Sequence, residues 1–321
     1  MRRFVAVRLA HAVVVLFLVA TIAFVLIHLA PGDPFSLDVP NVSPALRAQW
    51  RDAFGYDKPI AQQYLLYLRN VATGQLGYSH SLHIDVREAL ALHLPRTLLL
   101  MGLALVLSFA LGMRLGIYEA LHWRTRRARV TNAVSLLVYS LPDFWLALML
   151  LLGFSYWIAL LPAGGMIDPV LHDYMSPAQA FWDRVKHLIL PLATLTVIIT
   201  ALVARYQRAA LVETLPSDFV RTARAKGLDE RAVVGRHALR NALLPMITLA
   251  GLAFPALLGG AVFVERVFSW PGMGLMVVNA IHARDYPLVV AAVVIGAAMV
   301  VLGNLLADIA YGLADPRVRV R

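Results

Sequence analysis

The chain has 321 residues, no cysteine, and 29 Lys and Arg against 19 Asp and Glu, which gives a net charge of +10. Hydrophobic residues make up 60% of it and charged residues 15%, whereas soluble globular domains average about 45–50% and about 25%. This composition excludes a disordered chain and disfavours an ordinary soluble enzyme. Without cysteine there is no disulfide framework, thiolate nucleophile or cysteine-ligated metal cluster.

The apolar residues fall in six long blocks. A bilayer core about 30 Å thick is crossed by about 20 apolar helical residues, so each block is long enough for one crossing. We predict an all-α integral membrane protein with six transmembrane helices. The first follows the N-terminal tail within residues 1–32, and the others cover residues 97–118, 132–160, 188–206, 241–264 and 286–308.

The first block also has to be compared with a secretory signal, because Arg2 and Arg3 precede it. Its apolar stretch is longer than the roughly 7–15 residues of a signal core, and no small-residue cleavage site follows. We therefore expect it to be retained as the first transmembrane helix.

Basic residues are distributed unevenly between the two sides of the predicted helices. The N-terminus, residues 119–129, residues 205–240 and the C-terminal tail carry 18 Lys and Arg, or 19 with Arg114, against 10 in the loops at 33–96, 162–187 and 265–285. Cytoplasmic loops carry the excess of basic residues, so both termini are expected inside. This topology and anionic lipid account for the net charge without nucleic acid.

The segments between the helices differ in character. Residues 33–96 are expected to form a folded external subdomain, with aromatic residues among mixed charges, turn signals at 57–59 and 74–77, and an interfacial helix near 60–70. Residues 97–313 would form the transmembrane core, with a cytoplasmic loop at 207–240, and residues 314–321 a cytoplasmic tail.

The most informative loop segment is 215–245. Ser217 is expected to cap a short helix, with Asp218 at its positive end. That helix runs for about two turns to Lys226. Gly227 suits the left-handed position that ends a helix, and Asp229 opens a second one. The sequence thus predicts two short cytoplasmic helices joined at a glycine.

Three interpretations compete for this segment. It can be a basic loop of the kind found next to any transmembrane helix. A DNA-binding helix-turn-helix is disfavoured, because the bilayer would hold it at both ends. The third is a helix that docks into a groove of a cytoplasmic partner. The apolar contacts would be Phe219, Val220, Ala223 and Leu228, backed by Arg221, Arg224 and Lys226. Physical reasoning on the sequence alone does not choose between them.

At this point the chain closely resembles a known family, the membrane permease subunits of ABC importers in the dipeptide, oligopeptide and nickel branch. Its cytoplasmic signature is matched by Asp-Phe-Val-Arg-Thr-Ala-Arg-Ala-Lys-Gly-Leu at 218–228 and by Arg-His-Ala-Leu-Arg-Asn-Ala-Leu-Leu-Pro at 236–245. Further family-like runs occur at 31–34, 94–97, 141–145, 270–274 and 283–287. The similarity extends over nearly the whole chain.

The resemblance implies the fold of a type I ABC importer permease in a bacterial or archaeal inner membrane. It implies that this chain forms half of a translocation path with a second homologous permease subunit. Two cytoplasmic ATPases and an extracytoplasmic binding protein would complete the system. The residues implied in ATPase coupling are Asp218, Phe219, Val220, Arg221, Thr222, Ala223, Arg224, Ala225, Lys226, Gly227, Leu228, Arg236 and His237.

The expected cofactors belong to the partners. The chain has no Gly-x-x-x-x-Gly-Lys-Ser/Thr loop to hold nucleotide phosphates, so ATP and Mg²⁺ are expected on the ATPase subunits, and no metal or catalytic residue is expected here. The resemblance favours dipeptides and oligopeptides as substrates. Nickel chelates, glutathione and other small peptides or sugars remain alternatives.

Two departures accompany the resemblance. Against the general ABC-permease signature, only Ala223, Gly227 and Leu239 match, as is usual in the peptide branch, so the ATPase partner should be that branch's own. Asp143 stands in the third predicted helix where a small polar residue is expected. Because an acid near mid-membrane costs about 2.5–3.5 kcal/mol, Asp143 is expected to face the bundle interior or the translocation path.

Two other classes of function are weaker. A proton-coupled carrier needs paired ionisable groups within the membrane, and only Asp143 qualifies. An intramembrane enzyme would need a site such as His-Glu-x-x-His or Gly-x-Ser-x-Gly, and neither occurs. His28 is interpreted as a packed histidine and not as a metal ligand.

Overall fold

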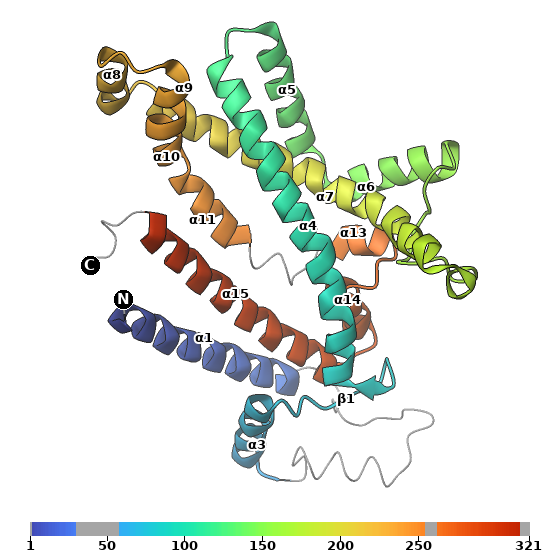
Figure 1. The fold of residues 1–321 in the computed structure, drawn as a ribbon. Helices are drawn as coiled ribbons and strands as arrows, with labels where there is room; N and C mark the ends of the chain where they lie inside the picture. Colours follow the sequence, from blue (N-terminus) through green and yellow to red (C-terminus); the bar gives the residue numbers. More distant parts are fainter. Residues whose placement is uncertain (1, 30–57, 254–261, 315–321) are drawn as a thin grey trace. The chain divides into compact units, whose positions relative to one another are not determined.

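The computed structural model describes residues 2–29, 58–253 and 262–314, and it is helical apart from one short hairpin (Figure 1). The first half contains α1 (Arg2–Leu29), α3 (Ile60–Thr73), β1 (Tyr78–Ser79), β2 (Ile84–Asp85), α4 (Val86–Leu121), α5 (Arg126–Ser140), α6 (Asp143–Leu151) and a π-helical turn at Leu152–Trp157. The second contains a 3-10 turn (His172–Tyr174), α7 (Pro177–Thr214), α8 (Asp218–Ala225), α9 (Glu230–Ala232), a π-helical turn (Val233–Ala238), α10 (Leu239–Ala242), α11 (Leu244–Ala253), α13 (Val262–Val267), α14 (Met273–His282) and α15 (Tyr286–Ala314).

Four helices in the described residues are long and apolar enough to cross a membrane. They are Ala10–Leu29 of α1, α4, α7 and Tyr286–Leu306 of α15, with mean hydropathies of 2.9, 2.1, 2.2 and 2.5. They correspond to the first, second, fourth and sixth predicted helices. The fifth falls on α11 and α13, with residues 254–261 between them outside the described part. The all-α membrane class is confirmed, and the count of six stays a prediction.

The third predicted helix, 132–160, is not one straight helix. Its two parts, Arg126–Ser140 and Asp143–Trp157, meet at an angle of 102°. Leu141 at the break has extended backbone (φ −79°, ψ 137°), because the ring of Pro142 disfavours the helical region for the preceding residue and the proline has no N–H to donate. The helix predicted at 132–160 is therefore a bent pair of helices, and its crossing of the membrane stays a prediction.

Two other helices extend well beyond their predicted bounds. α4 begins at Val86 instead of residue 97 and passes through Pro95 without a break. α7 begins at Pro177 instead of 188, and Pro191 lies within it. The start of α7 is fixed by a capping box, in which the side chains of Ser176 and Gln179 cap each other's backbone. The helix predicted near 60–70 is confirmed as α3, which ends at Gly74 with φ +73°.

The chain forms two compact units, each described by itself. The first comprises residues 1–97 and 272–302. Its core joins the start of α4 to α14 and α15, through buried Val86, Ala89, Met276 and Leu288. The described end of the segment at 33–96 thus shares a core with a segment from the C-terminal third of the chain.

A buried carboxylate holds this unit together at the hairpin. Asp285 is 0% exposed and accepts hydrogen bonds from the Ser79 hydroxyl (2.5 Å) and from the Ser81 hydroxyl and amide (2.6 and 3.0 Å). The ring of His80 lies 3.6 Å from its other oxygen. With its lone pairs used, the charge is tolerated in the interior, and the β1 turn is anchored to the start of α15.

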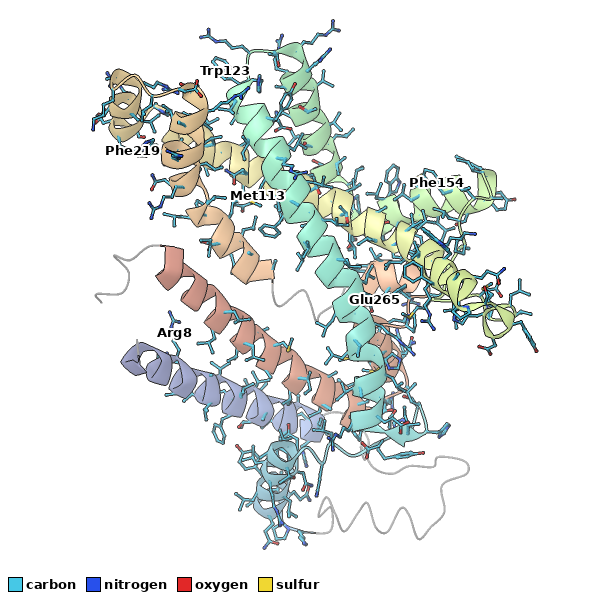
Figure 2. All side chains as sticks on the ribbon, in the orientation of Figure 1. Arg8, Met113, Trp123, Phe154, Phe219 and Glu265 are labelled. Carbon is cyan, nitrogen blue, oxygen red and sulfur yellow. The ribbon has the colours of Figure 1, made fainter. Side chains whose placement is uncertain are left out.

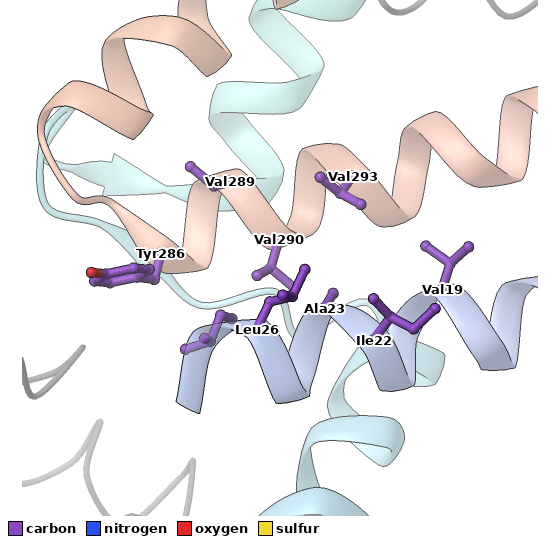
Figure 3. Close-up of a pocket in the computed structure, with 9 residues that line it drawn as sticks. Val19, Ile22, Ala23, Leu26, Tyr286, Val289, Val290 and Val293 are labelled. Atoms are coloured by element: carbon purple, nitrogen blue, oxygen red, sulfur yellow. The ribbon is translucent and has the colours of Figure 1, made fainter. Parts of the chain in front are cut away.

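Within the same unit α1 packs on α3, where the Thr21 and Tyr64 hydroxyls lie 2.7 Å apart. His28 Nδ1 is 2.8 Å from the carbonyl of Phe24, and Nε2 is 3.1 Å from Gln63 Oε1, which agrees with a packed histidine. An apolar cavity of about 290 Å³ separates residues 19–27 of α1 from 286–293 of α15 (Figure 3).

The second unit comprises residues 98–271 and 303–321. Its largest core joins α4, α6, α7 and α13 around Leu100, Leu190, Phe268 and Trp270. At the start of α7 the Asp183 carboxylate accepts from the amide of Asp168 (3.0 Å), and it lies 2.6 Å from Nδ1 of His172. This contact ties the loop before α7 to the helix.

Candidate functional site: the segment between α7 and α11

The segment 215–242 folds as the sequence predicts at backbone level. α8 runs from Asp218 to Ala225, and Gly227 follows with φ +77°. Asp229 then caps α9, its carboxylate accepting from the amide of Arg231. Two short helical pieces joined at a left-handed glycine are therefore confirmed.

The start of α8 differs from the prediction in one detail. Ser217 occupies the capping position with extended backbone, but its side chain makes no cap hydrogen bond. Its hydroxyl donates instead to the carbonyl of Thr214, at 2.6 Å. That bond ties α8 back to the end of α7, so Ser217 orients the helix instead of capping it.

One face of α8 is buried within the chain itself. Val220 is 0% and Ala223 5% exposed, and both belong to a core cluster that includes Leu211 of α7 and Ala120 of α4. The expectation that Val220 and Ala223 enter a partner's groove is thus wrong. Residues three apart share a helix face, and this face seats α8 on its own protein.

Beside this buried face, two apolar side chains stay exposed among basic ones. Phe219 and Leu228 are each 44% exposed. Phe219 lies near the start of α8 (Figure 2), and Leu228 follows Gly227 after its end. The remaining predicted coupling residues surround them. Exposed are Asp218, Arg221, Thr222, Arg224, Ala225, Lys226, Gly227 and Arg236, whereas His237 is partly buried.

An ion pair closes the turn between the two helical pieces. The Arg224 guanidinium donates two hydrogen bonds to the Glu230 carboxylate, at 2.7 and 3.1 Å. These bonds lower the pKa of Glu230 from its usual 4.5 and raise the pKa of Arg224. Because both side chains are about half exposed, the pair contributes to the shape of the turn more than to stability.

Asp143 lies apart from this segment. It is the first residue of α6, directly after the 102° break, and its Oδ1 accepts the amide of Phe144 at 2.8 Å. A carboxylate at a helix start is stabilised by the free N–H groups and the helix dipole. The side chain is partly exposed, so its charge sits at a helix terminus instead of in the middle of a continuous apolar helix.

The structure also brings together residues that sequence reasoning missed. Glu119 was placed in a cytoplasmic loop, yet it is 1% exposed, within α4. It lies in the same region as Gln207 of α7, which is 0% exposed. The available signal was the Gly-x-x-x-Gly spacing at 112–116, which marks close helix packing in apolar helices. Among the described residues no group of three or more His, Asp or Glu is arranged to hold a metal ion.

Long apolar helices and a polar two-helix segment between α7 and α11 define an α-helical integral membrane protein. Residues 98–320 match the family described as binding-protein-dependent transport system inner membrane component, and residues 1–101 match its N-terminal part. The chain belongs to this family, and it is therefore an inner-membrane component of a transport system.

Full-length relatives agree with this assignment. The chain is 40% identical over 334 residues to the di/tripeptide transport system permease protein DppB of Pseudomonas aeruginosa, covering 99% of each chain. It is 36% identical over 336 residues to the dipeptide transport system permease protein DppB of Escherichia coli, again covering 99% of each. It is 37% identical over 302 residues to the oligopeptide transport system permease protein AppB of Bacillus subtilis, covering 94% of each.

Proposed function

We propose that this chain is one of two homologous permease subunits of an ATP-driven importer of dipeptides and oligopeptides. An extracytoplasmic binding protein delivers the peptide, and two cytoplasmic ATPases, which hold ATP and Mg²⁺, drive its passage. The proposal is supported by family membership and by relatives named for dipeptide, di/tripeptide and oligopeptide transport. Nickel chelates and glutathione are the alternative substrates that uptake competition would distinguish.

The observation that supports the coupling role is that one face of α8 is buried in this chain while apolar side chains beside it stay exposed. Val220 and Ala223 fasten the helix to α4 and α7, while Phe219 and Leu228 stay exposed among basic groups. An exposed aromatic residue on a seated helix is typical of a partner contact, because such anchors carry most of the binding energy at interfaces. We therefore assign Phe219 and Leu228 to the ATPase contact, and Val220 and Ala223 to holding the helix in place.

The test is Phe219→Ala, with Trp123→Ala as the matched control. Trp123 is 57% exposed in the turn between α4 and α5 and lies outside α8. Phe219→Ala should reduce co-purification of the ATPase subunits, since truncating an interface anchor costs about 2 kcal/mol or more, while Trp123→Ala retains them. Equal ATPase recovery from both variants would contradict the proposal.

Topology follows from the distribution of basic residues. We propose that both termini and the α8 segment are cytoplasmic, with the loop before α7 outside. Reporter fusions at Arg124 and Asp229 should behave as cytoplasmic and a fusion at Asp173 as external. An external signal at Asp229 would rule out contact with ATPases at α8.

Asp143 is proposed to line the translocation path. Its support is a partly exposed carboxylate at the bend between two apolar helices, where a charge facing lipid would be costly. Asp143→Asn should preserve assembly and alter uptake. If Asp143→Leu left both uptake and stability unchanged, the residue would not belong to the path.

A further inference from the structure

Two glycines bring the backbones of α4 and α7 into direct contact. A Cβ added to Gly116 would lie 2.4 Å from the carbonyl oxygen of Ala204, and one added to Gly112 would lie 2.6 Å from Cβ of Val203. Neither separation is compatible with an ordinary non-bonded contact. Since an alanine at either position would force the helices apart, the two glycines set the distance between α4 and α7.

The seat of α8 is built on the same two helices, one turn further along. Val220 and Ala223 share a core cluster with Ala120 and Ile117 of α4 and with Ala210 and Leu211 of α7; Val233, Ala238 and Ala242 of the segment after α8 complete it. α8 therefore does not rest on one helix that can move alone. Its seat has the correct shape only while α4 and α7 keep their spacing.

One turn before Gly112 the Ser108 hydroxyl of α4 donates to the carbonyl of Thr196 of α7 at 3.2 Å, but the polar groups beyond the glycines hold the two helices together only weakly. The Ser135 hydroxyl of α5 donates to Glu119 Oε1 at a long 3.3 Å. Oε2 of Glu119 and both amide atoms of Gln207 are buried with no hydrogen-bond partner in the described part of the chain. An unpaired polar group adds no orientation of its own, so the close steric contact at the glycines is what fixes the spacing.

We propose that Gly112 and Gly116 are positioning residues that lock α4 to α7, so that a push on α8 moves both helices as one body. This inference rests on the proposed coupling role of α8 and deepens it. The lock converts a contact at Phe219 into displacement of the membrane core. If the helices were spread, the ATPases would still bind and hydrolyse ATP, but less of their motion would reach the path.

The experiment compares Gly116→Ala with Gly102→Ala in the complete complex with its permease, ATPase and binding-protein partners, reconstituted in proteoliposomes. Gly102 lies in the same helix, and a Cβ there meets nothing within 4 Å. The readout is uptake of radiolabelled dialanine per ATP hydrolysed. We expect Gly116→Ala to keep ATPase subunits and hydrolysis but to lower this ratio about tenfold, within the usual range of coupling between sites. Gly102→Ala should match the unmutated complex.

A compensating pair covers the case in which Gly116→Ala fails to assemble. Gly112→Ala should lower the ratio, and adding Val203→Gly should restore part of it, because this removes the Cβ and Cγ1 atoms that lie 2.6 and 2.8 Å from the new methyl group. Val203→Gly alone is the control for the loss of the valine. If Gly112→Ala acted through a general packing defect, adding Val203→Gly would lower the uptake per ATP further instead of raising it.

Two outcomes would overturn the lock: a ratio for Gly116→Ala equal to that for Gly102→Ala, or no recovery in the Gly112→Ala, Val203→Gly pair. Failure of the proposed function looks different. In that case Phe219→Ala would leave the ATPases bound and transport intact. If Phe219→Ala loses the ATPases while Gly116→Ala stays coupled, α8 is the docking helix and only the lock is wrong.

Discussion

Gly227 and Gly116 both occupy positions that favour glycine, for opposite reasons. Gly227 has a left-handed backbone (φ +77°) and open space where a Cβ would stand. Gly116 has ordinary helical backbone in α4 and no space, with the Ala204 carbonyl 2.4 Å from its missing Cβ. At Gly227 a side chain would strain its own residue, whereas at Gly116 it would displace a neighbouring helix. The first defect stays local, and the second spreads through the second unit.

The largest effect is expected from Gly116→Leu. Overpacking a close contact costs about 1–3 kcal/mol and at times more, and here the obstacle is backbone, which no rotamer change can clear. We expect a lower apparent melting temperature in detergent and a lower yield of assembled protein. Gly102→Leu should leave the melting temperature and the yield unchanged. Equal melting temperatures for Gly116→Leu and Gly102→Leu would show that Gly116 is not a closer contact than Gly102.

A smaller, local effect is expected from Gly227→Val. A non-glycine residue in the left-handed region costs roughly 1–2 kcal/mol, and β-branching adds to it. The protein should insert and melt normally, yet lose substrate-stimulated ATP hydrolysis and uptake together, because the turn after α8 changes shape. Measurement requires the reconstituted complex.

Gly227→Asn is the matched control, since asparagine visits the left-handed region more readily. It should retain most of the activity that valine abolishes. If valine and asparagine were equally harmful, crowding by a partner and not backbone conformation would explain the position, and Gly227 would resemble Gly116 after all.

The smallest effect is expected from Glu230→Gln, which removes the charge that pairs with Arg224 across the same turn. An exposed pair contributes less than about 1 kcal/mol. Because the hydrogen bonds from Arg224 lower the pKa of Glu230 below its usual 4.5, the contribution is present at neutral pH and is lost as the pH falls through the lowered value. Melting temperatures of the parent and the variant should therefore converge in acid and in high salt; a difference that persists there would point to packing instead.

Local features of this fold could be predicted from sequence, and contacts between distant segments could not. The left-handed turn at Gly227 follows from a glycine after a short helix, and the apolar blocks predict α1, α4, α7 and α15. That Val220 and Ala223 pack against this chain and not against a partner could not be predicted, because the sequence shows one apolar face on α8 but not what covers it. Gly116 had a visible spacing signal, but its partner, Ala204, lies almost 90 positions further along the chain.

The prolines also show that sequence alone does not predict effects that depend on tertiary packing. Pro142 and Pro191 lie in predicted transmembrane helices and Pro95 lies just before one, yet only Pro142 is at a bend of 102°, while Pro95 and Pro191 lie inside continuous helices. The missing N–H is common to all three. What differs is the packing around each one, which tertiary structure decides.

The length of α7 on each side of its contact with α4 sets how far its two ends move relative to each other. At 1.5 Å per residue, its 38 residues span about 57 Å, nearly twice a bilayer core of about 30 Å. From the crossing at Ala204, the arm to Leu211 beneath α8 is about 10 Å, and the arm to Asp183 at the other end is about 32 Å. If the locked pair of α4 and α7 turns as one body about a point near the glycine contact, a shift of 1 Å under α8 becomes roughly 3 Å in the opposite direction at Asp183. Because the chain has no cysteine, spin labels at single introduced cysteines near each end can measure that ratio directly, and equal displacements at the two ends would exclude the lever.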